Sequence, residues 1–124
     1  MSIGDFVKKL LKFFPSLEED VKKQIEFNDG EILYTVIIED IFMPEIIKLL
    51  EKDSDKEKLK KLFDFFEKVS TCDNKVLIEN YFAVTVLEVL GNDEKILNTA
   101  KKYMGPVTTK LQRQADLDIG RKVD

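Results

Sequence analysis

Two acidic side chains, Glu39 and Glu79, lie inside the most apolar stretches of the chain, and each has a polar neighbour, Asp40 or Asn80. Two carboxylates can act as general acid and general base in hydrolysis, but glycosidase chemistry of this kind needs a sugar-sized cleft, which a small packed domain rarely supplies. A buried charge otherwise needs a hydrogen-bond donor. Each acid therefore either lies at a helix–helix seam beside a Lys or Tyr, or faces outward toward a partner.

The acids belong to a phrase that occurs twice, forty positions apart. Val36-Ile37-Ile38-Glu39-Asp40-Ile41-Phe42 reappears as Val76-Leu77-Ile78-Glu79-Asn80-Tyr81-Phe82. A charged segment of helical period follows each copy, and the inward positions Leu59, Phe63 and Phe66 correspond to Ile96, Ala100 and Tyr103. This pattern predicts a paired-helix unit used twice, although similar apolar segments also recur in bundles without repeat symmetry.

Most catalytic side chains are missing from the sequence. The chain has no histidine and a single cysteine, Cys72, so neither a Ser–His triad nor a Cys–His pair nor a zinc site can form. Glycine-rich phosphate motifs are absent. The acids around Asp53 do not fit the calcium loop, because Lys58 occupies its sixth position. We therefore predict no enzyme activity, no cofactor and no metal site.

Composition indicates one soluble domain over residues 1–124. Apolar residues make up 44% and charged residues 35% of the chain, and its net charge is −4. Residues 31–53 contain six acids against two lysines, which favours a basic partner and disfavours nucleic acid. The lysines between 56 and 61 are typical of a solvated helix face. The lone cysteine, the lack of an apparent leader and the lack of a long apolar run predict a cytoplasmic protein without membrane contact.

Every segment is typical of helix, and capping residues mark the boundaries. We predict N-terminal caps at Ser2, Ser16, Ser54, at Asp73 or Asn74, and at Asn92 or Asp93. We predict helix ends at Pro15, at Asn28-Asp29-Gly30, at Gly91 and at Gly105, with Pro106 opening the last helix. The tail after about residue 118 is expected to fray.

The two helices that carry the acids are predicted to be central, because at 100° per residue they are apolar on nearly all sides. Pro44 lacks an amide donor, so we expect a kink or break there. The fold class is therefore all-α, with six to seven antiparallel helices forming a compact bundle or a short helical-hairpin array of the HEAT or tetratricopeptide kind.

The segment Leu77-Ile78-Glu79-Asn80-Tyr81-Phe82-Ala83-Val84-Thr85-Val86-Leu87-Glu88-Val89-Leu90 resembles a motif of a family of small, uncharacterised, all-helical bacterial proteins. In that motif an early Asn precedes a Val-Ser-[Phe/Tyr]-Leu-Glu-x-Leu run. The start from Phe6-Val7 to Phe14-Pro15, with Leu17, and the turn Met104-Gly105-Pro106-Val107 are similar to the family as well. Thr85-Val86 and Val89 depart from the motif. The resemblance implies a toxin-immunity protein of the contact-dependent inhibition type.

These observations favour a non-catalytic binding protein, and through the resemblance an immunity protein that neutralises a cognate toxin with a basic surface. The alternative is a helical adaptor that binds a peptide or partner helix in its groove. The residues predicted to bind the partner are the acids and the amide of the two central helices, although helical geometry cannot place them all on one face: Glu39, Asp40, Glu45, Glu79, Asn80 and Glu88. The oligomeric state is left open.

Overall fold

The computed structural model describes residues 1–123, which form seven helices without any strand, so the predicted all-α class is confirmed. Two of the helices change their hydrogen-bond pattern along their length and therefore carry more than one label. The elements are α1 (Ile3–Phe13), the 3₁₀ turn η1 (Pro15–Leu17), α2 (Glu18–Phe27), α3 (Tyr34–Ile37), η2 (Ile38–Phe42), α4 (Met43–Lys52), α5 (Lys56–Ser70), η3 (Leu77–Leu87), α6 (Glu88–Leu90), α7 (Glu94–Lys101) and α8 (Pro106–Asp118). Segments α3, η2 and α4 form one continuous helix, and so do η3 and α6.

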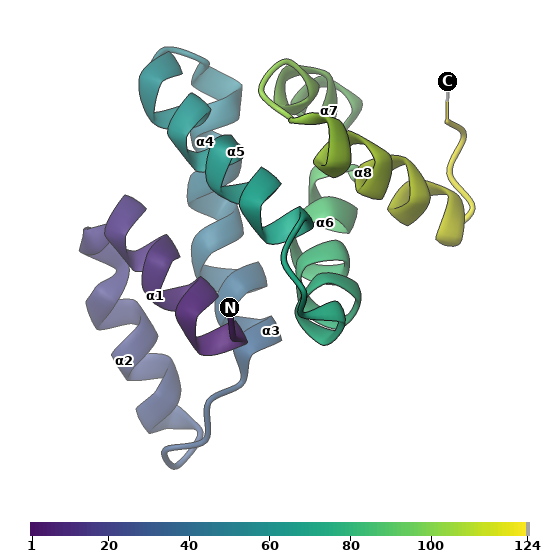
Figure 1. The fold of residues 1–124 in the computed structure, drawn as a ribbon. Helices are drawn as coiled ribbons and strands as arrows, with labels where there is room; N and C mark the ends of the chain where they lie inside the picture. Colours follow the sequence, from purple (N-terminus) through teal and green to yellow (C-terminus); the bar gives the residue numbers. More distant parts are fainter. Residues whose placement is uncertain (124) are drawn as a thin grey trace.

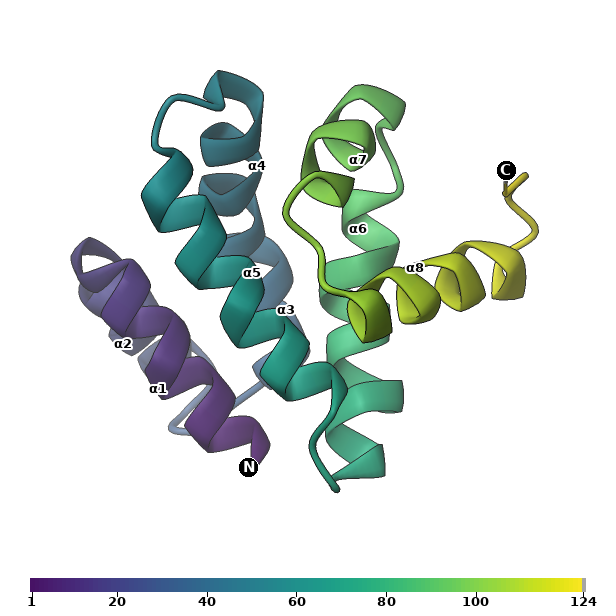
Figure 2. The same cartoon turned by 45° about the horizontal axis from the view of Figure 1, so that its top comes forward.

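The helices lie in two layers. In Figure 1 the helices α1, α5 and α8 lie in front of α2, the α3–η2–α4 helix and the η3–α6 helix. Figure 2 shows α1 and α5 side by side, running in opposite directions. The α3–η2–α4 helix followed by α5, and the η3–α6 helix followed by α7, are the two helix pairs that carry the repeated phrase. None of the helices described is long and apolar enough to cross a lipid bilayer.

The core joins these layers through aromatic rings. Phe6 of α1 is fully buried and lies 5.6 Å from Phe65 and 6.1 Å from Phe82, measured between ring centroids. Phe66 of α5 lies 5.4 Å from Phe82 of η3. Full burial of each such ring stabilises the fold by roughly 1.5–3 kcal/mol, so this cluster holds α1, α5 and η3 together.

The first helix boundaries follow the sequence closely. Ser2 and Asp5 form the predicted capping box, with hydrogen bonds of 3.1 Å in both directions. The predicted cap at Ser16 is wrong, because Pro15–Leu17 form a 3₁₀ turn and α2 begins at Glu18 without a side-chain cap. The predicted helix end at Gly30 is confirmed: its φ is +85°, and its amide donates to the Ile25 carbonyl of α2 at 2.9 Å.

Later boundaries also depend on side-chain caps. Asp55 caps α5 by accepting from the Lys58 amide at 3.2 Å, so the prediction of Ser54 as the cap is wrong by one residue. The predicted caps are confirmed at Asn74, which accepts from the Leu77 amide, and at Asp93, which accepts from two amides at the start of α7. At the start of α5 the Asp55 carboxylate, and not the Ser54 hydroxyl, therefore caps the helix.

Pro44 does not break its helix. The backbone is helical from Tyr34 to Lys52, and the proline is the second residue of α4, directly after the π-helical segment η2. The Met43 amide donates to the Ile38 carbonyl, five residues earlier. The proline therefore falls where the bonding changes from the π to the α pattern, a place where one missing donor is tolerated.

Side-chain hydrogen bonds hold the start and the middle of α8 against α5 and η3. At its start, the Glu67 carboxylate of α5 accepts from the backbone amides of Val107 and Thr108 at 3.0 and 2.8 Å. A side chain at Gly105 would place its Cβ 2.5 Å from the Glu67 Cδ, which explains the glycine. In its middle, the buried Gln112 side chain donates to the Leu87 carbonyl at 2.9 Å, so α8 is also tied to the end of η3.

Candidate partner-binding surface

Both copies of the repeated phrase contain π-helical backbone. Segment η2 covers Ile38–Phe42 and η3 covers Leu77–Leu87, and the Glu88 amide at the end of η3 donates to the Ala83 carbonyl. The two π segments lie in contact, and the rings of Tyr34 in α3 and Tyr81 in η3 meet edge to face at 6.4 Å between centroids. Because π bulges occur frequently at functional sites, the face that the two segments present is a candidate functional surface.

The π geometry decides which residues reach the surface. In an α-helix two residues seven apart share a face. Here Leu77 is 1% exposed while Val84 is 41% exposed, and Glu39 is exposed while Ile46 is fully buried. A hydrogen bond that spans five residues widens each turn, so the apolar residues keep to one side and the polar pairs turn outward.

Glu39 and Glu79 are consequently solvent-exposed, as are their neighbours Asp40 and Asn80. None of these four side chains makes a hydrogen bond or an ion pair to another residue in the part of the chain that the structure describes. The interpretation of the two glutamates as seam residues paired with Lys or Tyr is therefore wrong. They belong to the surface.

The six predicted site residues do not form one cluster. Asp40 and Glu45 line a groove between α2 and the η2–α4 helix, and Glu45 also forms an ion pair with Lys48 at 3.3 Å. Glu39 lies on η2 but not in this groove. Glu79 and Asn80 lie on the neighbouring η3, and Glu88 is half-buried in α6.

We refer to the groove between α2 and η2–α4 as the acidic groove. It encloses about 540 Å³ and combines apolar residues with three carboxylates and one lysine. Its lining residues are Leu17, Asp20, Lys23, Gln24, Phe27, Asp40, Ile41, Pro44 and Glu45. Phe27 is 83% exposed, the largest exposed fraction of any large apolar side chain described.

Sequence reasoning missed Phe27 and Asp20 as site residues. A signal for Phe27 was present, because it lies off the inner stripe of α2 that Val21 and Ile25 define. An aromatic residue on the polar side of an amphipathic helix has no place in the core and points to a contact outside the chain.

The groove is suited to binding by contact. Its apolar residues can receive or insert a side chain, while carboxylates on both helices attract basic groups. Within residues 1–123, no three acidic or cysteine side chains gather closely enough to hold a metal ion. The arrangement therefore offers shape and negative charge to a partner.

Comparison with curated proteins and with solved structures finds no match. The family model described as Domain of unknown function (DUF7674) matches residues 7–119, a span that contains every helix of the fold except the first residues of α1. The chain therefore belongs to the DUF7674 family.

Proposed function

We propose that the protein is a non-catalytic binding protein that captures a partner protein at the acidic groove. The observation that carries this proposal is Phe27, a large aromatic side chain left 83% exposed at the edge of a partly apolar groove. Aromatic anchors of this kind supply much of the binding energy of protein interfaces. Exposing such a ring without a partner gains no stability for the fold.

The charges around Phe27 indicate the sign of the charge on the partner's surface. Asp20, Asp40 and Glu45 line the groove, and Lys23 is the single lysine there. The exposed Glu39 extends the negative charge along η2, and Glu79 places further negative charge on η3. Opposite charge on a partner accelerates association and excludes acidic competitors. The partner is therefore a protein with a basic surface.

The more specific proposal is an immunity protein that neutralises a cognate bacterial toxin. It is supported by the resemblance of residues 77–90 to small helical bacterial proteins, together with an acidic surface that complements the basic cleft of a nucleic-acid-cleaving toxin. The alternative is an adaptor that holds a partner helix. It is supported by the apolar residues Leu17, Ile41 and Pro44 in the groove.

The test begins with the native complex, copurified on the tagged chain and identified by mass. Affinity is then measured by calorimetry at two salt concentrations for F27A, for D40K/E45K and for E39K/E79K. We expect F27A to weaken binding by on the order of thirtyfold, since an anchor residue contributes about 2 kcal/mol. Both charge reversals should weaken binding more at low salt, and D40K/E45K should have the larger effect.

The matched control is D118K, an exposed charge reversal at the end of α8, which should bind like the wild type. Wild-type affinity in folded F27A and D40K/E45K would reject the acidic groove. Coexpression with the identified partner separates the two specific proposals. An immunity protein relieves growth arrest caused by the partner, and F27A should relieve it less, whereas the partner of an adaptor is not toxic.

A further inference from the structure

A second groove lies in the other layer, between α1 and α5 (Figure 2). Its main part encloses about 640 Å³ and contains Lys9, Phe13, Phe65 and Lys68. It continues into a second depression of about 380 Å³ through the shared residues Phe13 and Lys61, and Lys12 lines that end. We call the whole depression the α1–α5 groove. It runs along α1, whose eleven residues span roughly 16 Å.

Every acidic side chain that lines this groove already has a partner in the chain. Asp5 accepts from the Ser2 amide at 3.1 Å, and Asp55 accepts from the Lys58 amide at 3.2 Å. Glu57 forms an ion pair with Lys61, and Asp64 forms one with Lys60, both at 3.0 Å. These carboxylates are partly compensated before any ligand arrives.

Four of the lysines that line the groove have no such compensation: Lys9, Lys12, Lys68 and Lys58, whose ammonium lies 4.5 Å from the centroid of the Phe14 ring. No carboxylate of residues 1–123 lies within 4.0 Å of any of these four ammonium groups. Lys12 is in the last turn of α1 and Lys68 is in the last turn of α5. Figure 2 shows that the two helices run in opposite directions. Lys68 therefore lines the groove at the end where α1 begins, with Met1 and Asp5, and Lys12 lines it at the end where α5 begins, with Asp55 and Glu57.

The floor of the groove is apolar. Phe13 is half-buried, its ring centroid lies 6.0 Å from that of Phe65, and the Lys9 ammonium lies 6.0 Å from the Phe13 ring. Uncompensated positive charge therefore borders an aromatic floor. Such a surface matches a helix that carries apolar residues on one face and acids beside them.

We propose that the α1–α5 groove docks an acidic amphipathic helix of a partner protein. Apolar residues of that helix lie on Phe13, and its acids pair with Lys9, Lys12 and Lys68. A single nucleic-acid strand fits less well, because it needs open ring faces for stacking. Phe65 is only 5% exposed, so its ring face is not open for stacking on a base. This site is independent of the acidic groove, which lies against α2 in the other layer.

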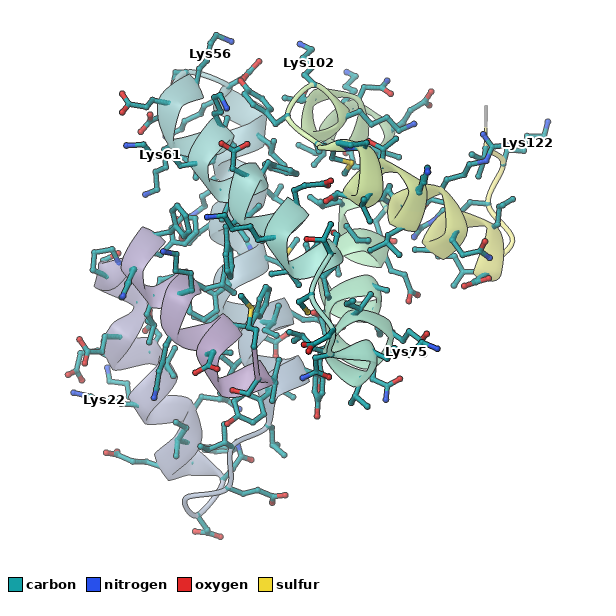
Figure 3. All side chains as sticks on the ribbon, in the orientation of Figure 1. Lys22, Lys56, Lys61, Lys75, Lys102 and Lys122 are labelled. Carbon is teal, nitrogen blue, oxygen red and sulfur yellow. The ribbon has the colours of Figure 1, made fainter. Side chains whose placement is uncertain are left out.

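The probe is a synthetic sixteen-residue helix with leucines at helical spacing and glutamates on both flanks, titrated into the ¹⁵N-labelled full chain. We expect amide shifts confined to α1 and α5, and a loss of affinity on the order of tenfold or more in K9E/K68E. The matched control is K22E/K75E, which reverses two exposed lysines on other helices (Figure 3) and should bind like the wild type. The F27A and D40K/E45K variants should also bind this peptide normally.

A second peptide of the same composition, with its leucines spread around the helix, should bind at least several-fold more weakly, because it presents no apolar face. Shifts that are absent at millimolar peptide, that lie outside α1 and α5, or that persist unchanged in K9E/K68E overturn the proposal. Stronger binding of a single-stranded oligonucleotide at the same lysines overturns it as well. None of these outcomes depends on whether the acidic groove binds its own partner.

Discussion

At the scale of single residues, Glu67 connects two distant parts of the chain. Helix α8 begins at Gly105 and Pro106, neither of which supplies a capping side chain. The Glu67 carboxylate takes that role from α5, accepting two amide hydrogen bonds and one from the Thr108 hydroxyl at 2.8 Å. Partial burial raises the pKa of the Glu67 carboxyl, but these donors outweigh it, so the pKa lies below its ordinary value.

This geometry predicts that E67Q destabilises the protein by about 1–3 kcal/mol at pH 7, because the amide cannot replace a charged acceptor at a helix N-terminus. The folded-state pKa of Glu67 is depressed, so its stabilisation is complete above the ordinary value of 4.5. It is lost as the pH falls through the lower folded value. The difference between E67Q and wild type in urea unfolding should therefore shrink at pH 3.

The control for this prediction is E57Q on the same helix, where the carboxylate is exposed and pairs only with Lys61. It should change the free energy of unfolding by less than about 0.5 kcal/mol. An equal loss in E57Q and E67Q, or an undiminished E67Q effect at pH 3, would contradict the capping role. The Glu67 carboxylate would then not be the group that caps α8.

At the scale of elements, the π segments η2 and η3 give their largely apolar helices one buried face and one exposed face. The prediction concerns Val84 and Val86, two residues apart on η3, which are 41% and 0% exposed. V84K should leave the free energy of unfolding within about 0.5 kcal/mol of wild type, because a lysine fits a surface position. V86K should prevent folding, because it buries an unpaired charge among apolar neighbours.

Thermal unfolding followed by circular dichroism distinguishes these outcomes. If η3 were an ordinary α-helix, Val84 would share its face with the buried Leu77 and Val86 would lie on the opposite face, so V84K would be the more damaging variant. A V84K variant that is as unstable as V86K, or less stable, would therefore contradict the π geometry. Lysine at Ile78 offers no such test, since that position is half-buried.

The helices and their ends were largely predictable because caps and glycines act locally. Ser2, Asn74 and Asp93 cap as predicted, since their partners lie two or three residues away. The π segments were not predictable, because a helical wheel assumes one period and the choice of period depends on neighbouring helices. The wheel therefore placed the acids on a nearly all-apolar helix, whereas the structure leaves them exposed.

The candidate site was predictable only in part for the same reason. Asp40 and Glu45, two of the residues predicted to bind a partner, line the acidic groove, but the groove also requires α2, which lies beside η2 and α4 only through tertiary packing. Nothing local in the sequence indicates that Phe27 faces this groove. The α1–α5 groove was hidden for a related reason, since only the tertiary fold places α1 beside α5.

At the scale of the whole molecule, charge is divided between two surfaces although the net charge is only −4. The acidic groove lies at α2 and η2–α4, and the α1–α5 groove lies in the other layer. A single partner that engaged both would have to present a basic surface to the acidic groove and an acidic helix to the α1–α5 groove. Two separate contacts, made by different partners or by two segments of one partner, fit this layout better.

The chain after α8 also holds the molecule together, and this gives the last prediction. Arg121 donates to the Glu88 carbonyl at 3.0 Å and to the Asp116 carboxylate at 2.9 Å, and it contacts Asn92 as well. Asp116 is only 5% exposed. Truncation after Gly120 should therefore destabilise the protein by about 3 kcal/mol, because it leaves a buried carboxylate without its cation.

Truncation after Arg121 keeps this ion pair and should unfold in urea within about 0.5 kcal/mol of wild type. Adding D116N to the shorter chain should restore part of the lost stability, since the amide removes the uncompensated charge while still able to bond to Gln112. If both truncations unfold alike, or if D116N makes the shorter chain weaker still, the contact between Arg121 and Asp116 does not stabilise the fold. The fraying that the sequence predicts after residue 118 would then extend through Arg121 itself, because only these contacts oppose it.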